Sequence, residues 1–356
     1  MNKLDFGIFL PNTSGALIFG ASYPPESLPS FKVNREVTRM AEDASFDYVL
    51  SQVKWRGFGG RSQHWDNSLE AFTLLSALAA TSSKIQLYAS VAIRTIHPVV
   101  IAKMATTIDD ISQGRFGVNI VSGWNKIEYD QMGLWDEDAY YNYRYTYAEE
   151  YMQVLRELWQ NGVASFDGRF FQLKDCLSLP KPPRPLPIVC AGQSDEGVAF
   201  TAKYADYAFV GAMQDDIGAL TRQRAKVDQA AAANGRSVGS YVLMTVIAEE
   251  TDAAALAKRD KFAENADQDA INNWMGFQKK DPNKAGREHD KRTAVHRAFL
   301  GVHLIAGSYQ TVAAHMDALA DGGLRGVCLA FPDYIADLPR FIDKVLPHCK
   351  SYRPTL

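Results

Sequence analysis

Apolar, strand-like segments alternate with amphipathic helical segments along the whole chain, and this alternation constrains the fold most strongly. The strand-like segments are apolar on both faces, as parallel strands are when helices cover them on either side. Eight strands with helices between them form a (β/α)8 TIM barrel, an α/β fold, without any reversal of strand order. A doubly wound sheet is the alternative, but it usually has fewer strands and a glycine fingerprint. The eight predicted strands are Leu4–Leu10, Tyr48–Val53, Ile85–Val91, Phe116–Val121, Pro187–Ala191, Tyr207–Val210, Tyr241–Ala248 and Gly326–Phe331.

Two insertions interrupt the repeat. Ser165–Leu173 carries Asp-Gly between apolar residues, which predicts a β-hairpin, and we expect it to cover an end of the barrel. Asn265 to Gly301 is largely polar and lacks clean periodicity, and a segment of this length inside a domain is typical of a lid, a binding loop or a disordered segment. No other stretch resembles a linker, so residues 1–356 are predicted to form a single barrel domain with a lid at 265–301.

Composition excludes several classes of partner. The net charge of −3 provides no basic field, so nucleic acid and anionic membranes are not expected as partners. The four cysteines are widely spaced without a CxxC pair, which indicates neither a disulfide framework nor a zinc site. The first apolar run is too short for a signal peptide or a membrane span, and we expect a cytoplasmic protein.

The functional residues of such a barrel lie at the carboxyl ends of its strands. The residues found there are polar or aromatic, and few are carboxylates. They are Asn12, Thr13, Ser14, Lys54, Trp55, Arg56, Ser90, Arg94, Asn119, Ser122, Trp124, Gln193 and Ser194. The seven histidines form no HxH or HExxH motif, and no facing carboxylate pair, Gly-x-Ser-x-Gly elbow or Walker motif is present. No metal site is therefore expected, and glycosidase, serine-hydrolase and phosphoryl-transfer functions are disfavoured.

Asn119 interrupts the apolar strand in GRFGVNIVSGW. A buried amide without hydrogen-bond partners costs about 1–3 kcal/mol. Asn119 is therefore either held by its neighbours as a structural device or directed at a ligand.

The segment CAGQSDEGVAF reads as a strand end, a glycine-containing loop and a helix start, which together can bind a phosphate group. The alternative is that Ser194 only caps its helix. Two acidic residues follow Ser194, so a phosphate there needs a nearby cation, for which Arg144, with Tyr145 beside it, is the candidate. Arg144 is alternatively a solvated helix residue.

Other residues also have two interpretations. Lys54 either snorkels to the surface or contacts a ligand, and Trp124 either packs or stacks on a ligand. His64 and His97 are interpreted first as structural or rim residues.

Long motifs across nearly the whole chain resemble the bacterial-luciferase-like, reduced-flavin-dependent monooxygenases, and within them the pyrimidine (uracil) monooxygenases. These motifs are SQVKWRGFGG, AATSSKIQLYAS, ATTIDDISQGRFGVNIVSGW, YMQVLRELW, VCAGQSDEG and AGSYQTVA. GRFGVNIVSGW is shared with sulfone and sulfonate monooxygenases of the same superfamily. The motifs therefore define the superfamily better than they define the substrate.

The resemblance implies roles for individual residues. An Asn and a Thr of the family place oxygen beside the flavin, and the matching catalytic residues here are Asn119 and Ser90. Substrate contacts are assigned to Asn12, in PNTSGALIFG, to Trp124, and to His97, in IRTIHPV. The flavin-contacting positions of the family fall on Val53, Lys54, Asn119, Glu128, Arg144, Tyr145 and Ser194.

The resemblance also implies a reaction. A separate NAD(P)H:flavin reductase would supply FMN as FMNH2, O2 would be the co-substrate, and a flavin peroxide at N5 would attack uracil at C4 and open the ring between N3 and C4. The alternatives are a sulfone, sulfonate or other heterocycle monooxygenase, a deazaflavin-dependent oxidoreductase, and a non-catalytic flavin-binding protein. Homo-oligomers are common in the family, so a homo-oligomer is expected here.

Overall fold

A computed structural model describes residues 2–20, 28–136, 139–212, 216–281 and 292–354. Within these ranges, eight parallel strands close a barrel in the order β11-β1-β2-β3-β4-β7-β8-β9, with β9 pairing with both β8 and β11. The predicted barrel and its predicted strands are confirmed. The barrel strands are β1 Asp5–Phe9, β2 Tyr48–Ser51, β3 Gln86–Ala92, β4 Phe116–Val121, β7 Ile188–Cys190, β8 Tyr207–Val210, β9 Gly239–Glu249 and β11 Gly326–Ala330.

A further strand, β10 (His303–Ser308), was not predicted. It pairs with the second half of β9, from Met244 to Glu249, beyond the part of β9 that pairs with β8. Strand β10 therefore continues the β8 side of the barrel past the point where β8 ends. Its alternation is weak because HLIAGS contains an Ala and a Gly at central positions.

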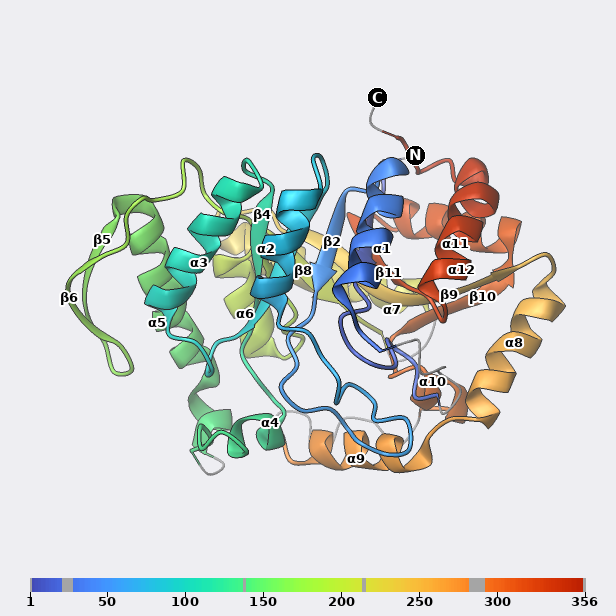
Figure 1. Ribbon diagram of the computed structural model, residues 1–356, viewed down its shortest axis with the longest axis horizontal. Coiled ribbons are helices and arrows are strands. Elements are labelled where there is room, and N and C mark those ends of the chain that lie inside the picture. Colours follow the sequence, from blue (N-terminus) through green and yellow to red (C-terminus); the bar gives the residue numbers. More distant parts are fainter. Residues whose placement is uncertain (1, 21–27, 137–138, 213–215, 282–291, 355–356) are drawn as a thin grey trace.

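Helices surround the barrel (Figure 1). Their ends follow local sequence signals: the Ser30 side chain accepts a hydrogen bond from the Val33 amide at the start of α1, and Gly162 ends α5 with a φ of 76°. The helices are α1 Phe31–Asp43, α2 Ala71–Thr81, α3 Pro98–Ile111, α4 Lys126–Asp130, α5 Tyr140–Asn161, α6 Asp195–Tyr204, α7 Ile217–Ala233, α8 Asp252–Glu264, α9 Gln268–Lys279, α10 Ala294–Ala298, α11 Tyr309–Asp321 and α12 Tyr334–Arg340, followed by the π-helical turn η4 Phe341–Val345 and the 3-10 turn η5 Leu346–His348. None of the helices in the described ranges is long and apolar enough to cross a membrane.

Aromatic side chains fill the amino-terminal half of the barrel. The Tyr241 ring stacks on the rings of Tyr48 and Tyr207, with 4.7 Å between ring centroids in each case, and Tyr88 meets Tyr48 edge to face at 5.6 Å. Three of these rings are buried and that of Tyr207 is partly buried, and such pairs stabilise a core beyond the area that they bury. The barrel is therefore solid at this end, and space for a ligand is left at the end where the strands terminate.

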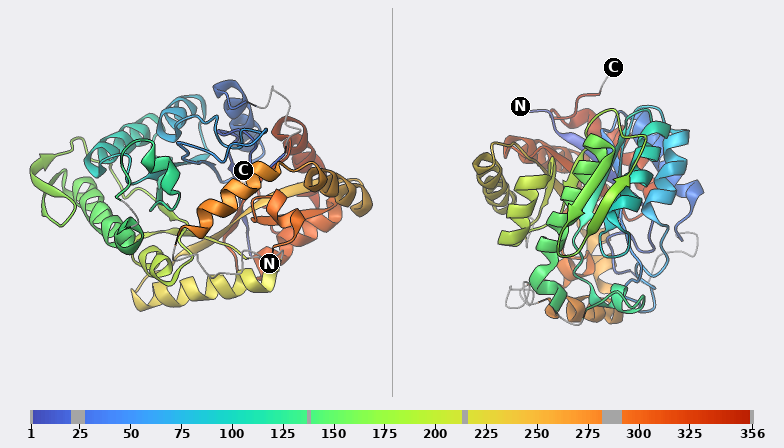
Figure 2. Two further views of the ribbon diagram at one scale, coloured as in Figure 1. Left: turned by 90° about the horizontal axis from the view of Figure 1, so that it is seen from below. Right: turned by 90° about the vertical axis from the view of Figure 1, so that its left-hand side faces the viewer.

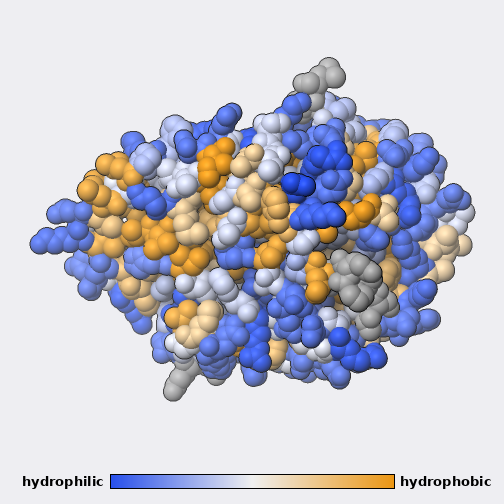
Figure 3. Space-filling model, viewed as in Figure 1, coloured by the Kyte–Doolittle hydropathy of each residue, from blue (hydrophilic) through white to orange (hydrophobic). Residues whose placement is uncertain are grey.

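The predicted hairpin is confirmed as β5 (Val163–Asp167) and β6 (Gln172–Leu177). It packs against α5 through Phe171, whose ring centroid lies 5.0 Å from that of Tyr147. Figure 1 shows the hairpin outside α5, so the expectation that it covers a barrel end is wrong. Apolar residues gather on this side of the molecule (Figure 3), and the exposed ones on α3, β5 and β6 include Val100, Val163 and Leu177. A homo-oligomer stays a prediction.

The predicted lid segment contains α9 and α10, and its residues 282–291 lie outside the described ranges. The buried face of α9 consists of Ala270, Ile271, Trp274 and Gln278, so an alanine and a glutamine weaken the apolar periodicity. Figure 2 shows α9 crossing the end of the barrel at which the strands terminate. Helix α9 therefore lies where a lid would have to be.

Candidate functional site

Two adjacent cavities open at the carboxyl ends of the barrel strands. The barrel cavity, of about 400 Å³, is bounded by residues that include Lys54, Ser90, Asn119 and Leu243. The loop cavity, of about 310 Å³, is bounded by residues that include Arg144, Tyr145 and Ser194. Both cavities share walls made by Val121, Gly123, Trp124, Ala191, Gln193, Gln278 and Arg292. One elongated ligand can therefore extend from one cavity into the other.

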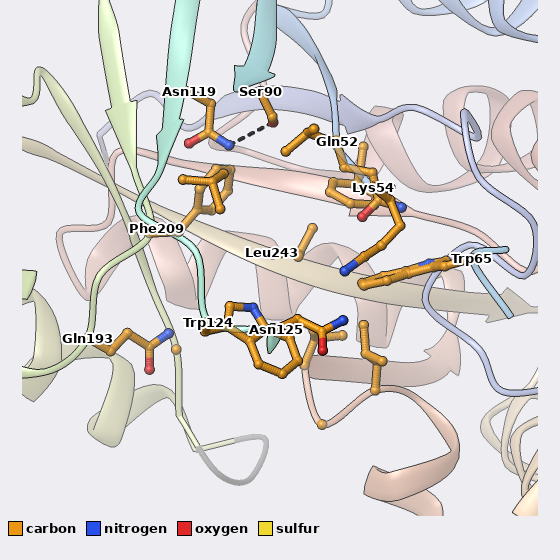
Figure 4. A pocket seen from close by; sticks show the side chains of 18 of the residues that line it. Gln52, Lys54, Trp65, Ser90, Asn119, Trp124, Asn125, Gln193, Phe209 and Leu243 are labelled. Carbon is orange, nitrogen blue, oxygen red and sulfur yellow. Dashed lines mark hydrogen bonds between the residues drawn. The ribbon is translucent and has the colours of Figure 1, made fainter. Parts of the chain in front are cut away.

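Asn119 and Ser90 lie side by side in the wall of the barrel cavity (Figure 4). They are register partners on β4 and β3, and Asn119 Nδ2 donates a hydrogen bond of 2.8 Å to Ser90 Oγ. Both side chains are buried, and Asn119 Oδ1 has no hydrogen-bond partner within the described part of the chain. The amide is thus held by its neighbour and also keeps one acceptor for a bound molecule.

Lys54 is buried beneath aromatic rings and does not snorkel to the surface. Its ammonium group forms an ion pair with Glu128, and the two side chains are only 5% and 7% exposed. The same nitrogen lies 5.3, 5.1 and 5.7 Å from the ring centroids of Phe58, Trp65 and Trp124. Trp124 therefore packs over Lys54 and lines both cavities. The arrangement forms an apolar wall with one internally neutralised charge pair.

Arg144 lies in the wall of the loop cavity, only 5% exposed, and is not a solvated helix residue. Its Nη1 lies 2.8 Å from Asp281 Oδ2, and its guanidinium lies 5.1 Å from the ring centroid of Tyr145. Arg144 Nε is buried without a hydrogen-bond partner among the described residues. An arginine in this state retains a donor for an anion.

Ser194 has both of the roles that the sequence left open. Its Oγ accepts a hydrogen bond of 3.1 Å from the Gly197 amide and so caps α6, while the residue also lines the loop cavity. The loop packs closely on the start of the helix. A methyl group on Gly192 would lie 2.8 Å from the Gly197 backbone, and one on Gly197 would lie 2.5 Å from the Tyr145 hydroxyl.

These residues fit a flavin mononucleotide. The loop cavity combines a buried arginine, a hydroxyl and the amino-terminal end of α6, which is the donor set that a phosphate group prefers. The barrel cavity offers aromatic and aliphatic walls of the kind that accept a flat ring system. A phosphate group would share Arg144 with Asp281. Among the described residues, no cluster of three or more His, Cys, Asp or Glu side chains is arranged to hold a metal ion.

Several residues of the barrel cavity were not predicted from the sequence. Trp274 and Arg292 come from the predicted lid segment, and the Arg292 guanidinium lies 5.1 Å from the Trp274 ring centroid. Burial lowers the pKa of Arg292. His303 begins the unpredicted strand β10, and burial lowers its pKa to about 3. Asn125 follows Trp124 in a motif that was singled out, so its position in the sequence could have drawn attention to it. No strand-end signal marks the other residues of this group.

Two predicted substrate contacts lie elsewhere. Asn12 Nδ2 donates to the Gln52 carbonyl at 2.8 Å, and Asn12 Oδ1 accepts from the Gln52 amide at 3.2 Å, so this side chain holds two strand-end segments together. His97 caps α3, accepting a hydrogen bond from the Val99 amide at 3.3 Å, and its ring packs against Phe171. Neither residue lines the barrel cavity or the loop cavity, and the structure does not support a substrate contact from them. Val53, Lys54, Ser90, Asn119, Trp124, Glu128, Arg144, Tyr145 and Ser194 all line one or both cavities.

Comparison with known proteins identifies the family of the chain. The family model of luciferase-like monooxygenases matches residues 4–326. The chain is 42% identical over 361 residues to the pyrimidine monooxygenase RutA of Enterobacter cloacae and to that of Escherichia coli O127:H6, with 99% of each chain covered. The crystal structure of riboflavin lyase RcaE shares the fold with a TM-score of 0.84 at 19% identity, covering 99% of this chain and 94% of that one. The match of the family model over most of the chain and the 42% identity to full-length relatives show that this protein belongs to the luciferase-like monooxygenases.

Proposed function

We propose that this flavin-dependent monooxygenase is the oxygenase of a two-component system that opens the uracil ring between N3 and C4, with FMNH2 and O2 as co-substrates. Members of the family use reduced flavin. The loop cavity is the observation that supports FMN as the cofactor. There Arg144 and the capped start of α6 would provide a phosphate site next to the barrel cavity. The 42% identity to pyrimidine monooxygenases supports the substrate and a separate NAD(P)H-dependent flavin reductase.

The residues of the chain would position the reactants and exclude water. Reduced flavin, when bound, supplies the electrons that activate O2. The Asn119 and Ser90 side chains would hold oxygen at the wall of the barrel cavity, because they form the polar pair that lines it on β3 and β4. Trp124 and Trp65 would exclude water from the reacting groups, which protects a reactive species from side reactions.

The first test is uracil consumption followed by liquid chromatography and mass spectrometry. The mixture contains the protein, FMN, NADH, a generic flavin reductase and isotopically heavy O2. We expect a ring-opened product that carries one heavy oxygen, because a monooxygenase transfers one atom of O2 to its substrate. Reactions without protein, and reactions with catalase, control for free hydrogen peroxide. If uracil persists although FMN binds, the pyrimidine assignment is wrong, and sulfones and other heterocycles are tested next.

We also propose that the segment 265–301 is a lid. Its α9 places Trp274 and Gln278 in the cavity walls, and Asp281, just after α9, contacts Arg144 in the proposed phosphate site. Flavin bound at Arg144 would therefore be in contact with the end of α9.

Limited proteolysis tests the lid. We expect cleavage within 265–301 to slow several-fold when FMN and uracil are added together, because local opening is suppressed by ligands that bind the closed form. Cleavage in the β5–β6 hairpin, which packs outside α5, is the internal control and should not change. Equal cleavage of the segment with and without both ligands would contradict the lid.

A further inference from the structure

Asn125 occupies a helix-capping position without capping the helix. It is the residue before α4, yet its side chain makes no capping hydrogen bond. An Asn at this position normally accepts a hydrogen bond from a backbone amide in the first turn. Here the side chain is only 1% exposed and lines the barrel cavity beside Trp124 (Figure 4). Its polar atoms are therefore used for something other than the helix end.

The orientation of the Asn125 amide follows from its neighbour. Asn125 Nδ2 donates a hydrogen bond of 3.0 Å to Glu128 Oε1, and Glu128 also pairs with the Lys54 ammonium group. The reverse orientation would place the amide oxygen against a carboxylate, where two acceptors repel each other. The nitrogen thus faces Glu128, and Oδ1 faces away from it.

Asn125 Oδ1 is buried and has no hydrogen-bond partner within the described ranges. Leaving such an acceptor unsatisfied costs about 1–3 kcal/mol. At this wall of the cavity a bound molecule is therefore favoured if it can donate a hydrogen bond. A pyrimidine-2,4-dione has two ring N–H groups, whereas a sulfone or a sulfonate offers only acceptors.

We infer that Asn125 is a specificity-determining residue whose Oδ1 accepts a hydrogen bond from a ring N–H of the substrate. The Lys54–Glu128 pair fixes the amide in the accepting orientation. This inference rests on the proposed function, and it predicts that the cavity binds cyclic imides in preference to sulfones.

The test compares the binding of uracil, 1-methyluracil and 3-methyluracil to the protein loaded with oxidised FMN, by isothermal titration calorimetry. For the natural protein we expect one of the two methylated rings to bind roughly 10- to 100-fold more weakly than uracil, because it lacks the required donor. Asn125→Ala should reduce this ratio to within about 3-fold. Asn125→Leu keeps the bulk of the side chain but has no acceptor. It should weaken the binding of uracil roughly 10-fold and abolish the preference for uracil over the methylated ring.

Matched measurements separate recognition from a structural role. Asn142→Ala, an exposed asparagine on α5, should retain the ratio of the natural protein. If Asn125 only supports Glu128, its variants will weaken the binding of uracil and of both methylated rings equally, and this result would overturn the inference. A fall in FMN affinity with an unchanged uracil ratio would also overturn it, because Oδ1 would then serve the flavin. If the natural protein binds FMN but none of the three rings, the proposed function itself is wrong. If the natural protein shows the preference and the Asn125 variants keep it, only the inference about Asn125 is wrong.

Discussion

Asn119→Ala is expected to bind FMN about as tightly as the natural protein and to lose oxygenation by about 100-fold or more. The proposed phosphate site is in the loop cavity, and Asn119 does not line that cavity, so the variant should leave the main anchor proposed for the flavin untouched. The variant removes the free Oδ1 acceptor and the Nδ2 donor to Ser90 from the wall of the barrel cavity. A loss of positioning of this kind near reacting atoms typically costs about two orders of magnitude in rate.

Stopped-flow spectroscopy of FMNH2 mixed with O2, together with product analysis, measures this effect. Flavin should still be reoxidised, but hydrogen peroxide should replace the oxygenated product. Asn142→Ala serves as the control for a surface asparagine. Retained product formation in Asn119→Ala would remove Asn119 from oxygen placement, and lost FMN binding would show that it anchors the cofactor instead.

The barrel could be predicted from the sequence because its strands are short apolar runs that end at polar residues. Strand β4 shows both features, running from Phe116 to Val121 and continuing into Ser122 and Gly123. Strand β10 was not predicted because it lies outside the eightfold repeat. It pairs with the second half of β9, beyond the part that pairs with β8. The position of the hairpin was wrong for a different reason: Asp-Gly specifies a local turn but contains no information about the element on which the hairpin packs.

The residues of the candidate site also fall into those that the sequence could predict and those that it could not. Strand ends indicated Lys54, Ser90 and Asn119, because parallel strands bring their carboxyl ends to one edge. The substrate contact assigned to His97 is not supported, since this residue caps the helix that follows the strand and lines neither cavity. Trp274 reaches the cavity only because α9 crosses the barrel end, which is a tertiary contact that no local pattern contains. The burial of Lys54 likewise depends on rings from three separate loop positions.

Lys54→Met is expected to lower the free energy of unfolding by about 3–5 kcal/mol, because it leaves the Glu128 carboxylate buried without its cation. The measurement is urea denaturation of the ligand-free protein, followed by fluorescence and circular dichroism. Lys203→Met, which removes one partner of the exposed pair between Lys203 and Glu149, is the matched control and should change stability by less than about 1 kcal/mol. An equally small effect at Lys54 would show that water reaches Glu128 and that the pair is not buried in solution.

The double variant Lys54→Met with Glu128→Leu separates stability from specificity. Replacing both members of a buried ion pair by apolar residues is often neutral or stabilising, so we expect most of the lost free energy of unfolding to return. The amide of Asn125 would then lose the carboxylate that orients it. If the double variant is stable but no longer distinguishes uracil from its methylated forms, the charged pair is present to orient the Asn125 amide, and its contribution to stability is secondary. If the preference persists, Asn125 is held by its own packing, and the pair needs another explanation within the flavin site.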